Sequence, residues 1–154
     1  MEMYDVTLID LNTQEELSVR IEVDEGETTE NIVISAIMNK QEITASNYNY
    51  LPAFQEFRDK LLIAGYGIKC NGSRLNAVQS GMMGATDQVY LVEMGKQAFL
   101  KDIVHIWDYA EIDTFPDTKQ QNAFLNNGVS GKFRFNQERE VLAEETDGGG
   151  TIWQ

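Results

Sequence analysis

Apolar and polar residues alternate with a period of two over most of the first 24 residues. Two such runs are separated by the polar residues 12–14, and their apolar members are Tyr4, Val6, Leu8, Leu17, Val19, Ile21 and Val23. This pattern predicts a β-hairpin with one apolar face and one charged face.

A change of period follows the hairpin. Ile32, Val33, Ala36 and Ile37 lie three to four residues apart, and Thr28 or Thr29 could cap a helix in front of them. We therefore expect a helix from about residue 28 to 39 that covers the apolar face of the hairpin. Residues 41–50 are rich in Asn, Ser and Thr and are expected to form a loop.

A second helical pattern begins near Pro52 and ends before Gly65. Three short strands are then expected over residues 67–70, 88–94 and 102–107, with a tight turn at Asn71-Gly72 after the first. The resulting order is β-β-α-α-β-β-β, an α+β fold with two helices on a small, mostly antiparallel sheet.

The pattern weakens after Pro116. A short helix over 118–125 and a strand over 131–135 are expected, followed by a polar, acidic stretch from Gln137. We predict one α+β domain over residues 1–136 and a flexible acidic tail over 137–154.

The composition indicates in which cellular compartment the protein is expected. The 154 residues contain no apolar run near the roughly 20 residues that a membrane-spanning helix needs. The first five residues contain two acids and no base, whereas a secretory signal would start with basic residues, and Cys70 is the only cysteine. These features predict a cytoplasmic protein without an internal disulfide.

Negative charge dominates the chain and is concentrated at its start. The net charge is −13, and residues 1–40 hold ten acidic residues against Arg20 and Lys40. Such a field repels nucleic acid and anionic membranes and speeds encounter with basic proteins. The alternative is that acidity serves only solubility.

Residues able to carry catalysis are sparse. His105 is the only histidine, which disfavours a zinc site, and no phosphate-binding glycine pattern occurs. The spacing of Asp108, Glu111, Asp113 and Asp117 lacks the glycine and terminal glutamate of an EF-hand loop. We expect no metal, no cofactor and no enzymatic activity, with a Cys70–His105 nucleophile pair as the alternative.

Two stretches resemble known families. The segments Cys70-Asn71-Gly72-Ser73-Arg74, Ser80-Gly81-Met82 and Asp102-Ile103 are arranged as in a group of short bacterial proteins of uncharacterised function. This resemblance implies a shared fold. The expected hairpin, acidic link and helix resemble the start of ubiquitin-like β-grasp domains, and Gly148-Gly149-Gly150 is similar to their processed diglycine tails.

The charge distribution predicts a binding protein that neutralises a basic partner, such as an immunity protein against a bacterial toxin. The expected acidic face consists of Glu15, Glu16, Glu22, Asp24, Glu25, Glu27 and Glu30. Two alternatives remain open. One is an anti-defence protein that mimics nucleic-acid charge, and the other is an accessory interaction module that binds through Asn71, Arg74, Ser80, Met82 and Met83.

Overall fold

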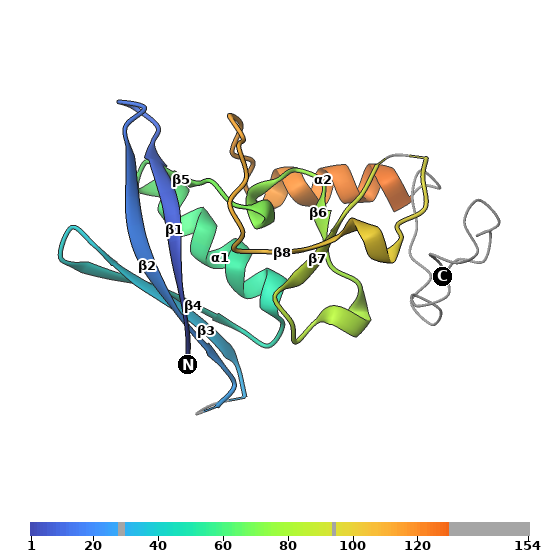
Figure 1. Cartoon of the computed structure of the whole chain (residues 1–154), viewed down its shortest axis with the longest axis horizontal. Helices are drawn as coiled ribbons and strands as arrows, with labels where there is room; N and C mark the ends of the chain where they lie inside the picture. Colours follow the sequence, from blue (N-terminus) through green and yellow to red (C-terminus); the bar gives the residue numbers. More distant parts are fainter. Residues whose placement is uncertain (28–29, 94, 130–154) are drawn as a thin grey trace.

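The computed structural model describes residues 1–27, 30–93 and 95–129. These residues form a five-stranded antiparallel sheet, a three-stranded antiparallel sheet and two α-helices (Figure 1), which confirms the predicted α+β class. In chain order the elements are β1 (Glu2–Asp10), β2 (Glu16–Glu25), β3 (Ile32–Met38), β4 (Gln41–Asn47), α1 (Tyr50–Ile63), β5 (Tyr66–Ile68), η1 (Asn71–Ser73), β6 (Ala77–Val78), η2 (Gly81–Met83), β7 (Gln88–Leu91), η3 (Leu100–Asp102), β8 (Ile103–His105) and α2 (Thr118–Val129).

The predicted N-terminal hairpin is confirmed by the pairing of β1 with β2. Tyr4 lies opposite Ile21, and Val6 lies opposite Val19, so the apolar positions of both strands share one face. The Asp10 carboxylate accepts hydrogen bonds from the backbone N–H groups of Asn12 and Thr13, which closes the turn. The complete sheet has the order β4-β3-β2-β1-β5.

The predicted helix over 28–39 and the predicted loop over 41–50 are wrong. Residues 32–38 form β3, which pairs with β4 in a second hairpin. Asn39 and Lys40 form its two-residue turn, with φ values of 50° and 67°. A positive φ at both central residues matches the right-handed twist of a hairpin, and asparagine tolerates it best after glycine.

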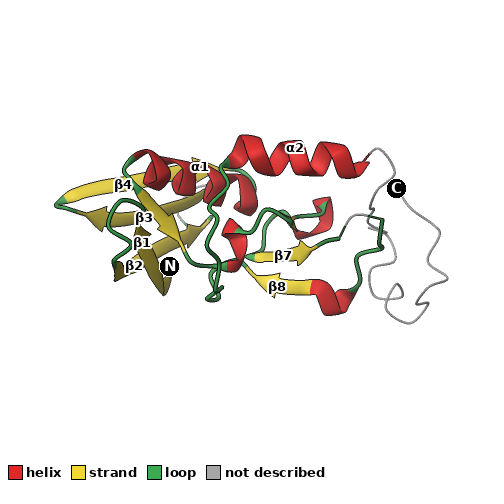
Figure 2. Cartoon of the chain, turned by 90° about the horizontal axis from the view of Figure 1, so that it is seen from above, coloured by secondary structure: helices red, strands yellow, loops and turns green. Residues whose placement is uncertain are grey.

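Helix α1 covers the apolar face of the five-stranded sheet, as Figure 2 shows from above. The helix has the predicted position, and Gly65, with a φ of 96°, follows its last turn. Phe54, Phe57 and Leu61 are fully buried against the sheet. Burial of each such side chain stabilises the fold by about 2–3 kcal/mol.

Trp107 joins the second sheet to the first. Its ring stacks on Tyr4 from β1 at 5.6 Å and meets Phe54 edge-on at 5.2 Å. Its indole N–H donates to the Tyr50 hydroxyl at 2.9 Å. The second sheet has the order β6-β7-β8 and includes two of the predicted strands, in shortened form, whereas β6 was not predicted.

A buried arginine links the two helices. Arg58 of α1 is 1% exposed, and its Nη2 donates to Gln121 Oε1 of α2 at 2.8 Å. Gln121 Nε2 donates onward to the carbonyl oxygens of Gly72 and Arg74 at 3.0 and 2.8 Å. The predicted helix over 118–125 is therefore present as α2. The predicted strand over 131–135 and the tail over 137–154 lie outside the described residues.

Candidate functional site

The seven residues of the predicted acidic face do not lie together. Glu16, Glu22 and Asp24 share the face of β2 opposite α1, but Glu16 and Asp24 are eight residues apart. At roughly 3.3 Å per residue this separation is about 26 Å. The acidic residues therefore fall into two groups, one at each end of β2.

The group at the start of β2 is engaged in an internal ion pair. Lys69, which is almost fully buried, donates from Nζ to Glu16 at 2.8 Å and to Glu111 at 2.7 Å. These hydrogen bonds raise the pKa of Lys69 and lower that of Glu111. Glu16 is thus paired within the chain, while Glu15 is exposed in the adjacent turn.

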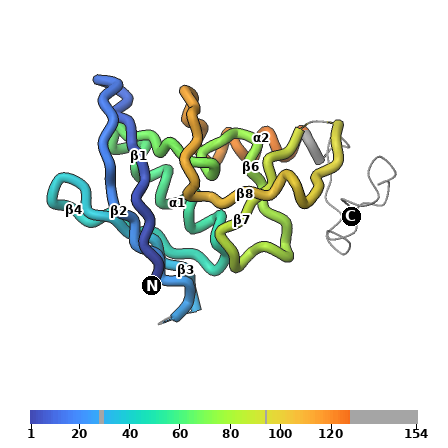
Figure 3. Tube along the Cα trace, viewed as in Figure 1, coloured from blue at the N-terminus to red at the C-terminus, as the bar shows by residue number. Residues whose placement is uncertain are grey.

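The group at the other end of β2 is a cluster of carboxylates near the N-terminal ammonium. We define the acidic end as Glu2, Glu25, Glu27 and Asp87. Partial burial raises the pKa of Glu25, and the negative charges of Asp87, Glu2 and Glu27 raise it further. The N-terminal ammonium of Met1 pairs with Glu27, and Figure 3 shows the N-terminus beside the end of β2.

The second sheet contributes Asp87 and a histidine to this end. His105 Nδ1 lies 3.1 Å from both carboxylate oxygens of Asp87, and its side chain is 54% exposed. Asp87 also raises the pKa of Tyr4, after the larger effect of partial burial. The acidic end therefore combines residues of β1 and β2 with Glu27, which follows β2, and Asp87, which precedes β7.

Sequence reasoning missed two members of the acidic end. Glu2 could have been placed from the hairpin register, because it lies opposite Val23, two residues before Glu25. Asp87 had no local signal, since tertiary packing brings it to the first sheet. Of the remaining predicted residues, Asp24 accepts hydrogen bonds from the N–H groups of Gly26 and Glu27, and Glu30 is exposed beyond the undescribed residues 28–29.

The alternative binding segment is mostly internal. Asn71 is buried, donates to the His105 carbonyl at 3.2 Å and accepts from Arg74 Nε at 3.0 Å. Ser80 and Met83 are also buried, whereas Met82 is 62% exposed. The expected tight turn at Asn71-Gly72 is the short helix η1. Gly72 packs so closely there that an added Cβ atom would lie 2.8 Å from Ile106.

The candidate nucleophile pair is not assembled. The Cys70 thiol is fully buried with Ser73 Oγ at 3.8 Å, and burial raises its pKa to about 11. His105 instead faces Asp87 at the surface. Within the described ranges, no group of three or more His, Cys, Asp or Glu side chains could hold a metal ion, so the acidic residues 108–117 form no such group.

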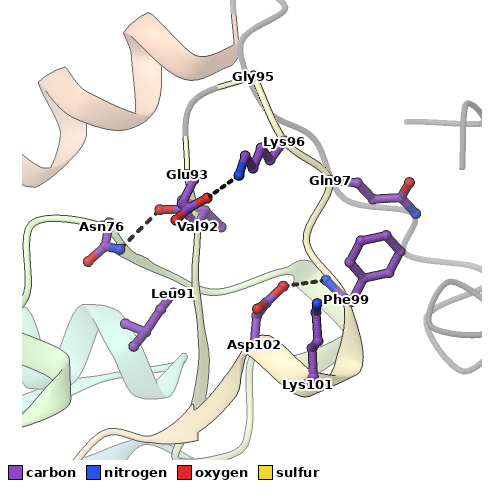
Figure 4. Close-up of a pocket in the computed structure, with 10 residues that line it drawn as sticks. All are labelled: Asn76, Leu91, Val92, Glu93, Gly95, Lys96, Gln97, Phe99, Lys101 and Asp102. Atoms are coloured by element: carbon purple, nitrogen blue, oxygen red, sulfur yellow. Dashed lines mark hydrogen bonds and ion pairs between the residues drawn. The ribbon is translucent and has the colours of Figure 1, made fainter. Parts of the chain in front are cut away.

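A hollow of about 670 Å³ lies beside β7 and η3 (Figure 4). Its charged residues are of mixed sign: Lys96 pairs with Glu93 at 3.2 Å, and the Asp102 carboxylate accepts the Phe99 N–H at 2.8 Å. Lys101 lies over the Phe99 ring at 5.6 Å. The hollow is lined by two lysines and two acids, so it shows no preference for ligands of one charge.

Comparison with known proteins gives no match, either to a protein-family model or to a curated protein. Neither α1 nor α2 is long and apolar enough to cross a membrane, and the part of the chain that the structure describes holds no other candidate. The functional proposal therefore depends on the charge and geometry of the described side chains, above all on the acidic end.

Proposed function

We propose that this protein binds and neutralises a basic protein partner in the cytoplasm, in the manner of an immunity protein that inhibits a toxin. The observation that carries the proposal is the acidic end, where burial and then the neighbouring carboxylates of Asp87, Glu2 and Glu27 raise the pKa of Glu25. The ionised Glu25 carboxylate is therefore less favourable in the folded chain, and a cationic partner would offset this. A cluster that costs stability but favours binding is typical of a functional surface.

The charge of the whole chain supports the same proposal. A net charge of −13 attracts a basic protein over a distance of about one Debye length, roughly 8 Å at physiological ionic strength. The same field disfavours direct binding of nucleic acid or anionic membranes. The acidic end would then supply the short-range contacts with basic side chains of the partner.

Affinity capture from the cells that make the protein tests the proposal. Three C-terminally tagged baits are compared: the unchanged chain, a triple variant with Glu2→Gln, Glu25→Gln and Glu27→Gln, and a control with Glu15→Gln, Glu56→Gln and Glu93→Gln. Both triple variants have the same net charge, and the control changes exposed residues away from the acidic end. Only the position of the removed charges differs.

We expect the unchanged and control baits to retain a basic protein that the acidic-end variant loses by at least tenfold. The activity of the captured protein then distinguishes a toxin from a nucleic-acid-binding protein whose ligand this chain mimics. Equal retention by both triple variants would contradict the assignment to the acidic end. Capture of no basic protein at low ionic strength would contradict the proposed function itself.

A further inference from the structure

The two hairpins of the five-stranded sheet diverge from each other. β2 and β3 pair only from Glu22 opposite Ser35 to Glu25 opposite Ile32. The pairing of β2 with β1 continues to Glu16, and that of β3 with β4 continues to Met38. Figure 1 shows the β3–β4 hairpin turning away from β1–β2. Among the described residues, the backbone of β2 from residue 16 to 21 therefore has a strand on its β1 side and none on its β3 side.

A groove of about 330 Å³ occupies this divergence. It is lined by Ser18, Val19, Arg20, Glu22, Ser35, Ala36, Ile37 and Glu42. Most of these side chains belong to the sheet face opposite α1, because Glu22 pairs with Ser35 and Ile37 pairs with Glu42. A strand edge with unused N–H and C=O groups is a template for an added strand.

The side chains around the groove define what it would accept. Glu22 and Glu42 form no ion pair within the described ranges, whereas Arg20 is paired with Asp5 at 3.2 Å. Ile37 is 72% exposed between them. Two free carboxylates around an exposed apolar side chain complement an extended segment in which basic and apolar residues alternate.

The sheet edge at β4 is less open to an added strand. Lys60 Nζ from α1 donates to the Thr44 carbonyl of β4 at 2.6 Å, which occupies a backbone acceptor in the middle of that strand. A lysine at an edge is a common obstacle to further pairing. The β2 side of the groove has no such obstacle among the described contacts.

We propose that the groove binds an extended basic segment of the partner, which pairs with β2 as an added strand and places its cationic side chains near Glu22 and Glu42. This inference rests on the proposed function, because the occupant is a segment of the same basic partner. It adds a mode of recognition: backbone hydrogen bonds give affinity, and the two carboxylates select basic residues.

A peptide titration monitored by amide NMR tests the inference. The probe is the acetylated, amidated hexapeptide Lys-Val-Lys-Val-Lys-Val, and the control is Glu-Val-Glu-Val-Glu-Val. We expect the lysine peptide to shift the amides of residues 17–21 and 36–38. Those β2 amides that do not bond to β1 should exchange with solvent at least tenfold more slowly in the complex. The glutamate peptide should cause neither change.

Charge variants separate the groove from the acidic end. The double variant Glu22→Gln and Glu42→Gln should weaken peptide binding at least tenfold, whereas Glu15→Gln and Glu56→Gln together should leave it within twofold. Amide shifts confined to Glu2, Glu25, Glu27 and Asp87 would contradict peptide binding in the groove but would be consistent with the proposed function. The absence of shifts in residues 17–21 at millimolar peptide would also contradict binding in the groove, whatever the affinity capture shows.

Discussion

Arg58 is a charged side chain buried in the interior of the fold. The guanidinium bonds to Asp59 through Nε at 2.8 Å and to Gln121 through Nη2, while Nη1 has no hydrogen-bond partner among the residues that the structure describes. It also lies 5.5 Å from the centre of the Phe54 ring. Burial of a charged arginine with one unsatisfied nitrogen lowers the stability of the fold. The packing of the side chain and its hydrogen bonds to α2 must offset this loss.

Replacement of Arg58 should therefore depend on the volume of the new side chain. We expect Arg58→Ala to lower the free energy of unfolding by about 3 kcal/mol or more, because it leaves a cavity and removes a partner from Gln121. Arg58→Met fills most of the space without a charge and should cost less than half as much. Urea denaturation measures both, with the exposed Glu56→Ala on the same helix as the control. A similar loss in Arg58→Ala and Glu56→Ala would contradict this role.

The Cys70 thiol should be chemically inert in the folded protein. Burial raises its pKa to about 11, so almost no thiolate is present at pH 8. We expect Ellman's reagent to label Cys70 at least a hundredfold more slowly in buffer than in urea. Rapid labelling of the folded chain would contradict its burial.

The same raised pKa links stability to alkaline pH. The folded thiol keeps its proton to higher pH than the unfolded thiol, whose pKa is roughly 8.5. The free energy of unfolding should fall as the pH rises from 9 toward 11, and Cys70→Ala should remove the part of this slope that the thiol causes. An unchanged slope in Cys70→Ala would show that other groups account for it.

At the scale of elements, the pattern identified the first hairpin and α1 but failed for β3. Ile32, Val33, Ala36 and Ile37 fit a helical stripe, yet residues 32, 34, 36 and 38 also alternate, and these are the buried ones. The β-branched run Ile32-Val33-Ile34 and the Asn39-Lys40 turn favoured a strand. Short apolar stretches fit both periods, and only pairing with β2 and β4 decides between them.

Helix α2 has a reciprocal cap that could be read from its sequence. The Asp117 carboxylate accepts the Gln120 N–H at 2.9 Å, and the Asp117 N–H donates to Gln120 Oε1 at 2.9 Å. We expect Asp117→Ala to lower the free energy of unfolding by about 1 kcal/mol, because it leaves N–H groups at the helix start without a partner. Urea denaturation checks the value against Asp113→Ala, which changes an exposed acid outside the helix. Equal effects would show that the cap contributes little.

At the scale of the whole molecule, the sequence indicated where negative charge is concentrated but not how it is arranged. Eight of the ten acids of residues 1–40 lie on β1, β2 or the turn between them, toward opposite ends of this hairpin, and Lys69 neutralises part of one end. Lys69 and Asp87 are more than 40 residues from the hairpin carboxylates that they meet. Composition cannot reveal such long-range contacts. The predicted tail and the resemblances to other families remain predictions.

If a basic partner binds at the acidic end, Glu25 lowers the stability of the free protein and strengthens its binding to the partner. Its raised pKa means that the ionised carboxylate is less favourable in the folded chain than in the unfolded one. Glu25→Gln should therefore raise the free energy of unfolding at pH 7, by about 0.5 kcal/mol or less because water screens an exposed group. The gain should disappear as the pH falls below about 4 and the native carboxylate becomes protonated.

Calorimetric titration of the captured partner into the unchanged chain, Glu25→Gln and Glu15→Gln at pH 7 tests the central claim most directly. We predict that Glu25→Gln weakens binding at least fivefold although it does not destabilise the fold, and that Glu15→Gln changes binding less than twofold. Equal affinities for all three proteins would contradict the claim that the acidic end binds the partner.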